Sequence, residues 1–323
     1  MTDTNTSHDQ TTEQDFNKHL ANQVANEFLK EQRRNRRWGI FFKCLFALYL
    51  LGFFGIYLSE TLDIPGRGLS GDSHTALIEV EGAIGAGERA SADNIVSGLR
   101  AAYKDDKTAG IILRINSPGG SPVQSGYIND EIVRLKQKHP DIPVYAVISD
   151  ICASGGYYIA SAADEIYADK ASLVGSIGVI MAGFGFVDTI EKLGVERRVR
   201  HAGENKAFMD PFAPLKENEI AHVDTMLDEI YEQFKAVVKK GRGERLDSND
   251  DTVFSGLLWT GERAMELGLV DDLGSSSYVA REIIGAEDIV NYSYKPNYLD
   301  RFAERLGTSI SNKLLSYINI DIN

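Results

Sequence analysis

The chain has 323 residues, enough for about two domains, and its hydrophobic fraction of 43% is ordinary for a globular core. The formal net charge of -13 argues against nucleic acid as a partner. Only two cysteines are present, Cys44 and Cys152, so neither a disulfide framework nor a zinc site is expected, and we predict no metal and no other cofactor.

A membrane anchor is predicted near the N-terminus. Residues 1–37 are polar and end in a basic run, and residues 38–58 are almost continuously apolar, with Lys43 as their one charge. About twenty helical residues cover the hydrocarbon thickness of a bilayer. A cleaved signal peptide and a buried core helix are the alternatives, but the leader is long and residues 59–62 make a poor cleavage site. The basic flank places the N-terminus in the cytoplasm and the following residues outside.

After a linker at residues 59–74, strand and helix patterns alternate over residues 75–290, and a C-terminal extension follows at 291–323. Such alternation favours an α/β fold with a largely parallel sheet. The pattern predicts strands at 76–81, 111–116, 144–149, 165–168, 176–181 and 196–199. It predicts helices at 94–103, 126–137, 154–162, 218–240, 261–266 and 277–284.

Ser154 is the first candidate for chemistry. It lies among small residues directly after the apolar run 143–148, where a strand is expected to end and a helix to begin. Backbone N–H groups are free at such a junction and the helix dipole is positive there, so an oxyanion beside Ser154 would be stabilised. As a nucleophile, Ser154 would make the protein a hydrolase, and it would need a base.

The base has two kinds of candidate. Of the six histidines, only His74 and His201 lie where a Ser-His-Asp triad could use them, and the triad stays open. The other candidate is Lys206, which is flanked by apolar and aromatic residues. A lysine acts as a base only when it is neutral, which burial or a nearby cation favours. Alone, a lysine in such a loop is most often a solvated surface residue.

A second loop, residues 114–122, follows one predicted strand and precedes a helix. Its two glycines, Gly119 and Gly120, permit a tight turn and close approach of the backbone. An ordinary strand-to-helix turn explains it equally well. In the functional interpretation, the N–H of Gly119 or Gly120 is one oxyanion donor and that of Gly155 is the other.

Taken together, the motifs resemble the S49 peptidases, the signal peptide peptidase A-type serine proteases of the ClpP/crotonase superfamily. The matching pieces, in order, are Asn-Ser-Pro-Gly-Gly (116–120), Ala-Ser-Gly-Gly-Tyr-Tyr (153–158), Gly-Ser-Ile-Gly-Val (175–179), Lys206 before Asp-Pro-Phe, Trp-Thr-Gly (259–261) and Gly-Leu-Val-Asp (268–271). The run at 254–258 departs from the family pattern. The resemblance implies a ClpP/crotonase-like spiral of ββα units in the short, single-unit form of the family, whose long form contributes the lysine and the serine from separate tandem units.

The resemblance also implies roles for single residues. Ser154 would be the nucleophile, Lys206 the general base and Ser176 the residue that orients the lysine, while Gly119, Gly120 and Gly155 would line the oxyanion hole. Ser176 could equally be a turn serine.

The implied function is a membrane-anchored serine endopeptidase that hydrolyses remnant signal peptides or other membrane-associated peptides. It would lie in the bacterial inner membrane with an extracytoplasmic peptidase domain, and would form homo-oligomers. The alternatives are a crotonase-like acyl-CoA enzyme and a catalytically inactive membrane scaffold.

Overall fold

The computed structural model describes residues 36–55, 73–247 and 251–295. The helix at 36–55 and the residues from 73 onward belong to two separate compact units, and each is described by itself. Most of the predicted N-terminal polar segment and linker, and the C-terminal extension from residue 296, lie outside the described residues.

The first unit contains one apolar helix, Arg36–Gly55, whose side chains are exposed along its whole length. By length and composition it is the only helix among the described residues that could cross a membrane. The helix begins two residues before the predicted start of the span at residue 38, and residues 56–58 of the predicted span lie outside the described part.

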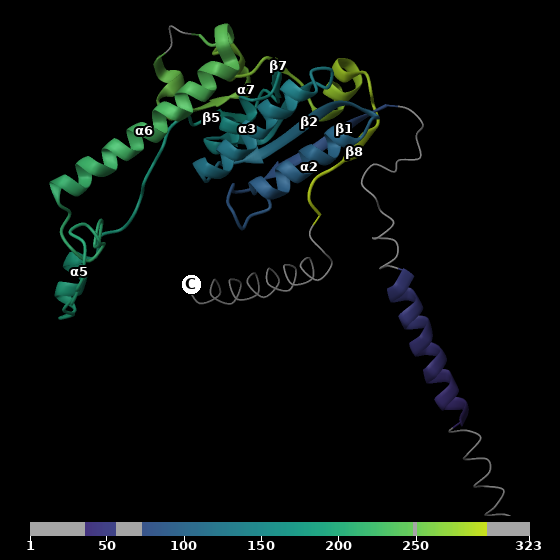
Figure 1. Cartoon of the computed structure of the whole chain (residues 1–323), viewed down its shortest axis with the longest axis horizontal. Helices are drawn as coiled ribbons and strands as arrows, with labels where there is room; N and C mark the ends of the chain where they lie inside the picture. The colour runs from purple at the N-terminus through teal and green to yellow at the C-terminus, as the bar shows by residue number, and fades with distance from the viewer. Residues whose placement is uncertain (1–35, 56–72, 248–250, 296–323) are drawn as a thin grey trace, which may run out of the picture. The chain divides into compact units, whose positions relative to one another are not determined.

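The second unit is an α/β fold, as predicted. Its sheet runs in the order β6-β5-β3-β2-β1-β8, with β4 paired to β3 and β7 paired to β4 (Figure 1). All pairs are parallel except β5 with β6. The strands are β1 (His74–Glu81), β2 (Thr108–Ser117), β3 (Val144–Ala153), β4 (Glu165–Ala168), β5 (Leu173–Gly175), β6 (Leu258–Thr260), β7 (Asp272–Leu273) and β8 (Ile289–Asn291).

The sheet branches at β3, and this branch positions the end of the strand. The first half of β3 pairs with β4 through Tyr145 to Ile148, and its last residues, Ile151 to Ala153, pair with β5 instead. The sheet therefore turns around the end of β3, in agreement with the ClpP/crotonase-like spiral. Ser154 comes directly after this branch point.

Both faces of the sheet are buried, which explains the near-continuous apolar strands. Ile111 and Leu113 of β2 face the large core under α2 (Ala92–Lys104) and α3 (Pro122–Lys138), while Ile112 faces a smaller core. The smaller core is closed by α8 (Ser276–Tyr278) and the π-helical segment η3 (Val279–Ile284).

The remaining helices are α4 (Gly155–Ala160), α5 (Val187–Lys192), α6 (Glu217–Arg242) and α7 (Gly261–Glu266), with short 3-10 turns at Gly243–Arg245 and Asp251–Phe254. Two predicted strands, at 176–181 and 196–199, were wrong. Residues 176–186 and 193–216 form no strand. Residues 177–181 are apolar, but no strand among the described residues accepts their backbone hydrogen bonds. Residues 196–198 are charged and exposed, so this segment has no apolar face to bury in a sheet.

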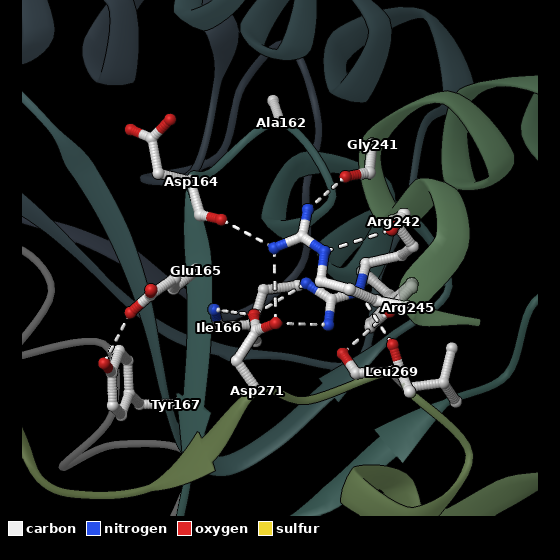
Figure 2. Close-up of polar contacts among 12 residues, drawn as sticks. Ala162, Asp164, Glu165, Ile166, Tyr167, Gly241, Arg242, Arg245, Leu269 and Asp271 are labelled. Carbon is white, nitrogen blue, oxygen red and sulfur yellow. Dashed lines mark hydrogen bonds and ion pairs between the residues drawn. The ribbon is translucent and has the colours of Figure 1, made fainter. Parts of the chain in front are cut away.

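The C-terminal end of α6 is fixed to the sheet by one buried cation. The Arg242 guanidinium donates to both carboxylate oxygens of Asp271, at 2.7 and 2.9 Å, and its Nε donates to the Gly268 carbonyl (Figure 2). Asp271 also accepts from the Ile166 amide of β4. Nearby, Tyr157 of α4 donates its hydroxyl to the Leu269 carbonyl. These bonds connect α6, α4 and β4 into one body.

Candidate active site

Ser154 occupies the junction between β3 and α4 with an unusual backbone. Its φ of 50° and ψ of -120° lie in a region that L-residues rarely adopt. Its amide donates to the Gly175 carbonyl at 2.9 Å, and its side chain makes no capping bond to the helix. The hydroxyl is thus half-buried and uncommitted at the N-terminal end of α4. Strained backbone of this kind concentrates at functional sites.

Only three non-glycine residues among those described have positive φ, and they are Ser154, Ser176 and Met209. Two of them are predicted site residues, and the third lies three positions after Lys206. Among the described residues, non-glycine residues with positive φ therefore occur only in or next to the segments that carry the sequence motifs.

The loop before α3 presents two glycines to Ser154. The Gly119 amide donates to Ser117 Oγ at 3.1 Å, so this N–H already has an acceptor. The Gly119 carbonyl accepts from Ile84. Within the described residues, the amides of Gly120 and Gly155 have no acceptor. These two free N–H groups lie beside each other, since a Cβ built on Gly155 would stand 3.3 Å from the Gly120 nitrogen.

Close packing explains why glycine stands at these positions. A Cβ on Gly119, whose φ is +99°, would lie 2.7 Å from the Ser154 Cβ and 2.8 Å from the Gly155 nitrogen. A Cβ on Gly155 would lie 2.5 Å from Ser125 Oγ of α3. Real Cβ atoms do not tolerate such distances, so any larger residue would shift the nucleophile or the free amides.

Ser176 is connected to Ser154 through one residue. Gly175 accepts the Ser154 amide, and the next residue, Ser176, donates its own amide to the Leu257 carbonyl at 2.7 Å. The Ser176 side chain is half-buried. The structure thus brings Ser154, Ser176 and the three glycines to one edge of the sheet.

Lys206 is not brought to this place within one chain. It lies in the arm, which we define as residues 177–216, between β5 and α6. The arm is held at the beginning of α6, where the Met209 amide donates to Glu219 and Phe208 packs edge-on against His222 (Figure 1). The Lys206 side chain is exposed, and among the described residues it has no hydrogen bond or ion pair.

The length of α6 separates the two residues. Ser154 and Ile230 of α6 line the same pocket. Phe208, two residues after Lys206, instead contacts His222, which lies eight residues earlier in α6. Eight residues of helix correspond to about 12 Å along the axis. A lysine side chain extends about half of that, so contact requires movement of the arm or a second copy of the chain.

Within one chain, neither of the two histidines considered for a triad lies beside Ser154. His74 begins β1, is buried and bonds to the Tyr292 hydroxyl at 3.0 Å. Because β1, β2 and β3 are parallel, the beginning of β1 and the end of β3 lie at opposite edges of the sheet. His201 is exposed in the arm and contacts only the Gly203 carbonyl with its ring nitrogen.

Two other chemistries find no support among the described residues. Cys152, two positions before Ser154, is fully buried, and burial raises the pKa of its thiol, so the reactive thiolate is disfavoured. No group of three or more His, Cys, Asp or Glu side chains in the described part of the chain is arranged to hold a metal ion.

A groove of ≈ 570 Å³ begins at Ser154, and the sequence motifs did not indicate it. One wall is a face of α3, the other is a face of α6, and the beginning of the arm closes one end. The lining residues are Gly120, Pro122, Val123, Gly126, Tyr127, Asp130, Ser154, Gly155, Tyr158, Gly178, Val179, Ile180, Ile230, Gln233 and Phe234. Helical spacing, at 123, 126, 127 and 130 and at 230, 233 and 234, was the available signal.

Comparison with known proteins places the chain in a family. The model of peptidase family S49 matches residues 136–288, a range that includes Ser154, Ser176 and Lys206. A putative protease of Synechocystis sp. is 35% identical over 200 residues, which are 62% of this chain and 69% of that protein. The chain belongs to peptidase family S49. This confirms the resemblance stated from the motifs.

Two further relatives are longer than the matched region. A putative signal peptide peptidase SppA of Enterococcus faecium is 35% identical over 190 residues, 58% of this chain and 54% of that protein. A Brucella abortus protein named Na(+)/H(+) antiporter NhaA is 41% identical over 227 residues, 69% of this chain but 31% of that protein. The S49 chain therefore spans about a third to a half of the length of these two relatives.

Proposed function

We propose that this S49 chain is a serine peptidase in which Ser154 attacks the carbonyl carbon of a peptide bond. The observation that carries the proposal is the pairing of a strained, uncommitted Ser154 with two free amides, those of Gly120 and Gly155. Backbone N–H groups aimed at one point stabilise the oxyanion of a tetrahedral intermediate. Between the two glycines named from the sequence, Gly120 is the proposed donor, because the Gly119 amide is bound to Ser117.

The proposed base is Lys206, oriented by Ser176. In its neutral form the amine takes the proton from Ser154 Oγ as the C–O bond forms, and returns it to the leaving amine as the C–N bond breaks. Water, deprotonated by the same amine, then attacks the acyl carbon. As the bond from that carbon to Ser154 Oγ breaks, the amine returns the proton to Oγ and the new carboxyl end is released. Relatives named as a putative signal peptide peptidase and a putative protease support peptide hydrolysis as the reaction.

We further propose that Lys206 serves Ser154 of a neighbouring copy in a homo-oligomer. Two observations support this. The arm holds Lys206 at the far end of α6 from the groove, and its apolar side chains are unusually exposed, among them Ile180 at 85%, Phe184 at 82% and Leu193 at 71%. A second copy that covered this surface would also remove water from the ammonium group and favour its neutral form.

The proposed substrates are remnant signal peptides or other membrane-associated peptides. The apolar helix Arg36–Gly55 is long enough to anchor the chain in a bilayer, and the basic residues before it favour an N-terminus in the cytoplasm with the peptidase unit outside. An anchored peptidase would meet peptides at the membrane surface. One relative is named as a putative signal peptide peptidase.

A serine-directed fluorophosphonate probe tests the proposal on the full-length chain. We expect covalent labelling of the wild type and hydrolysis of a quenched peptide, loss of both in Ser154→Ala, and loss of hydrolysis in Lys206→Ala with the fold retained. Labelling that persists in Ser154→Ala, or full hydrolysis by Lys206→Ala, would contradict the assigned roles. Turnover of an acyl-CoA thioester in place of peptides would favour the crotonase-like alternative.

A further inference from the structure

The groove that begins at Ser154 is apolar along most of its length. Val123 and Tyr127 of α3 line one side with 57% and 60% of their surfaces exposed, and Phe234 of α6 lines the other side. Phe234 packs against Tyr158 with ring centroids 5.1 Å apart. Apolar side chains exposed beside a nucleophile suit an apolar stretch of a substrate peptide.

Among the described residues, one charged side chain lines the groove, that of Asp130. Its carboxylate is exposed and has no ion pair or hydrogen bond to any described residue. Tyr158 lines the same groove, and burial together with the charge of Asp130 raises the pKa of its hydroxyl.

Two of the nearby cations pair with other carboxylates. Asp130 also borders a second, smaller pocket that contains Lys136, Lys240 and Arg245. Lys136 pairs with Asp164 at 2.7 Å, and Arg245 pairs with Asp271 at 3.2 Å. Lys240 lines the same pocket, and no ion pair connects it to Asp130 among the described residues. Within the described part of the chain, Asp130 therefore has no ion-pair partner.

The spacing along α3 suits a long side chain. Asp130 lies eight residues after Pro122, which is about 12 Å along the helix axis. Helical side chains lean toward the N-terminus, so the carboxylate leans back toward Ser154. An arginine or lysine side chain has an apolar stem and a charged end about 6–7 Å from its Cα, and would contact apolar walls before it reached a carboxylate.

We propose that Asp130 determines specificity, by binding a basic side chain of the substrate peptide that lies in this groove. This inference rests on the proposed peptidase function and adds its substrate class, which is an apolar peptide with an arginine or lysine near the cleavage point. An ordinary solvated surface aspartate would have no such effect.

Arginine and citrulline peptides test this, because the two side chains have nearly the same shape and differ in charge. Quenched apolar peptides with one arginine or one citrulline at each of the positions on either side of the scissile bond are offered to the full-length protein, and kcat/KM is measured with the cut site checked by mass spectrometry. At one position we expect the wild type to prefer arginine about tenfold, mainly through KM, because the ion pair forms in the ground state as well. The preference should weaken as ionic strength rises.

Variants assign the preference to Asp130. Asp130→Asn should bring the arginine-to-citrulline ratio to about one, Asp130→Lys should invert it, and Asp130→Glu should keep most of it. Asp106→Asn, which removes an exposed aspartate outside the groove, should leave the ratio unchanged. A ratio that is the same in the wild type and Asp130→Asn overturns the inference but leaves the peptidase standing. Failure of the wild type to cleave any peptide, with no labelling of Ser154, overturns both.

Discussion

Arg242 and Asp271 form a two-point ion pair at the base of α6, with the Arg242 side chain only 1% exposed. The pair fixes the helix whose other end bears the arm with Lys206 and whose middle forms one wall of the groove. Burial by itself would raise the pKa of Asp271, but the hydrogen bond and charge of Arg242, the Ile166 amide and the charge of Arg245 together hold it below its usual value. The carboxylate therefore stays ionised and the pair stays intact at neutral pH.

Arg242→Met should destabilise the second unit by about 3–5 kcal/mol, because it leaves Asp271 with fewer partners in a buried place. Arg242→Lys should not rescue it, since an ammonium cannot donate to both carboxylate oxygens and to Gly268 as the guanidinium does. Urea unfolding followed by circular dichroism measures the loss. Arg281→Met is the control, because the Arg281–Glu282 pair is exposed, and it should unfold at the wild-type urea concentration.

Gly119→Ala should slow fluorophosphonate labelling and peptide hydrolysis by at least about a hundredfold, the size of effect expected when oxyanion stabilisation is lost. The added Cβ would stand 2.7 Å from the Ser154 Cβ, in a backbone conformation that alanine disfavours. Gly87→Ala is the matched control, because a Cβ there meets nothing within 4 Å and the backbone is unstrained. Equal rates for the two variants would mean that the loop does not hold Ser154.

Much of this site was predictable from the sequence, because small residues and glycines at a strand end are visible as letters. Ser154, Gly120 and Gly155 meet because consecutive parallel strands end at one edge, a consequence of the alternating pattern. The position of Lys206 was not predictable, since it depends on how residues 177–216 leave the sheet. Residues 177–181 are as apolar as a buried strand, but no strand in the described part of the chain pairs with them. The groove was missed because it forms between α3 and α6, and the sequence does not show which helix faces which.

Gly126→Leu tests whether the groove admits substrate. Gly126 lines the groove within α3, and a Cβ there meets nothing within 4 Å, so a leucine side chain would enter the empty space without a clash. Leucine is also the better helix former, by about 0.8 kcal/mol, so the fold should not suffer. We expect peptide hydrolysis to fall about tenfold while the small fluorophosphonate still labels Ser154. Unchanged hydrolysis would place the substrate elsewhere.

The lowered pKa of Glu131 predicts that the protein loses stability in acid. The hydrogen bond from Arg134, opposed by burial and aided by Arg100, lowers the pKa of Glu131 from 4.5 to about 2. A carboxyl group with a lowered folded-state pKa contributes stability above pH 4.5 and loses that contribution as the pH falls toward 2. Glu131→Gln should therefore cost about 1 kcal/mol at neutral pH and progressively less below pH 4.5. Urea unfolding at a series of pH values measures this. A difference in unfolding free energy between the wild type and Glu131→Gln that stays constant below pH 4.5 would contradict the lowered pKa of Glu131.

The last prediction concerns which copy of the chain supplies Lys206 to a given Ser154. Ser154→Ala and Lys206→Ala are each expected to be inactive as pure proteins. If Lys206 acts on the serine of a neighbouring copy, an assembly made by co-expressing the two variants contains some sites with both residues intact. A site is complete when its serine comes from one variant and its lysine from the other, so random one-to-one mixing should restore about one quarter of wild-type hydrolysis. Co-expression of Ser154→Ala with the double variant is the control and should restore none. Absence of activity in the first mixture would contradict the use of a neighbouring copy's lysine, and the arm would then have to move to bring Lys206 to Ser154 of its own chain.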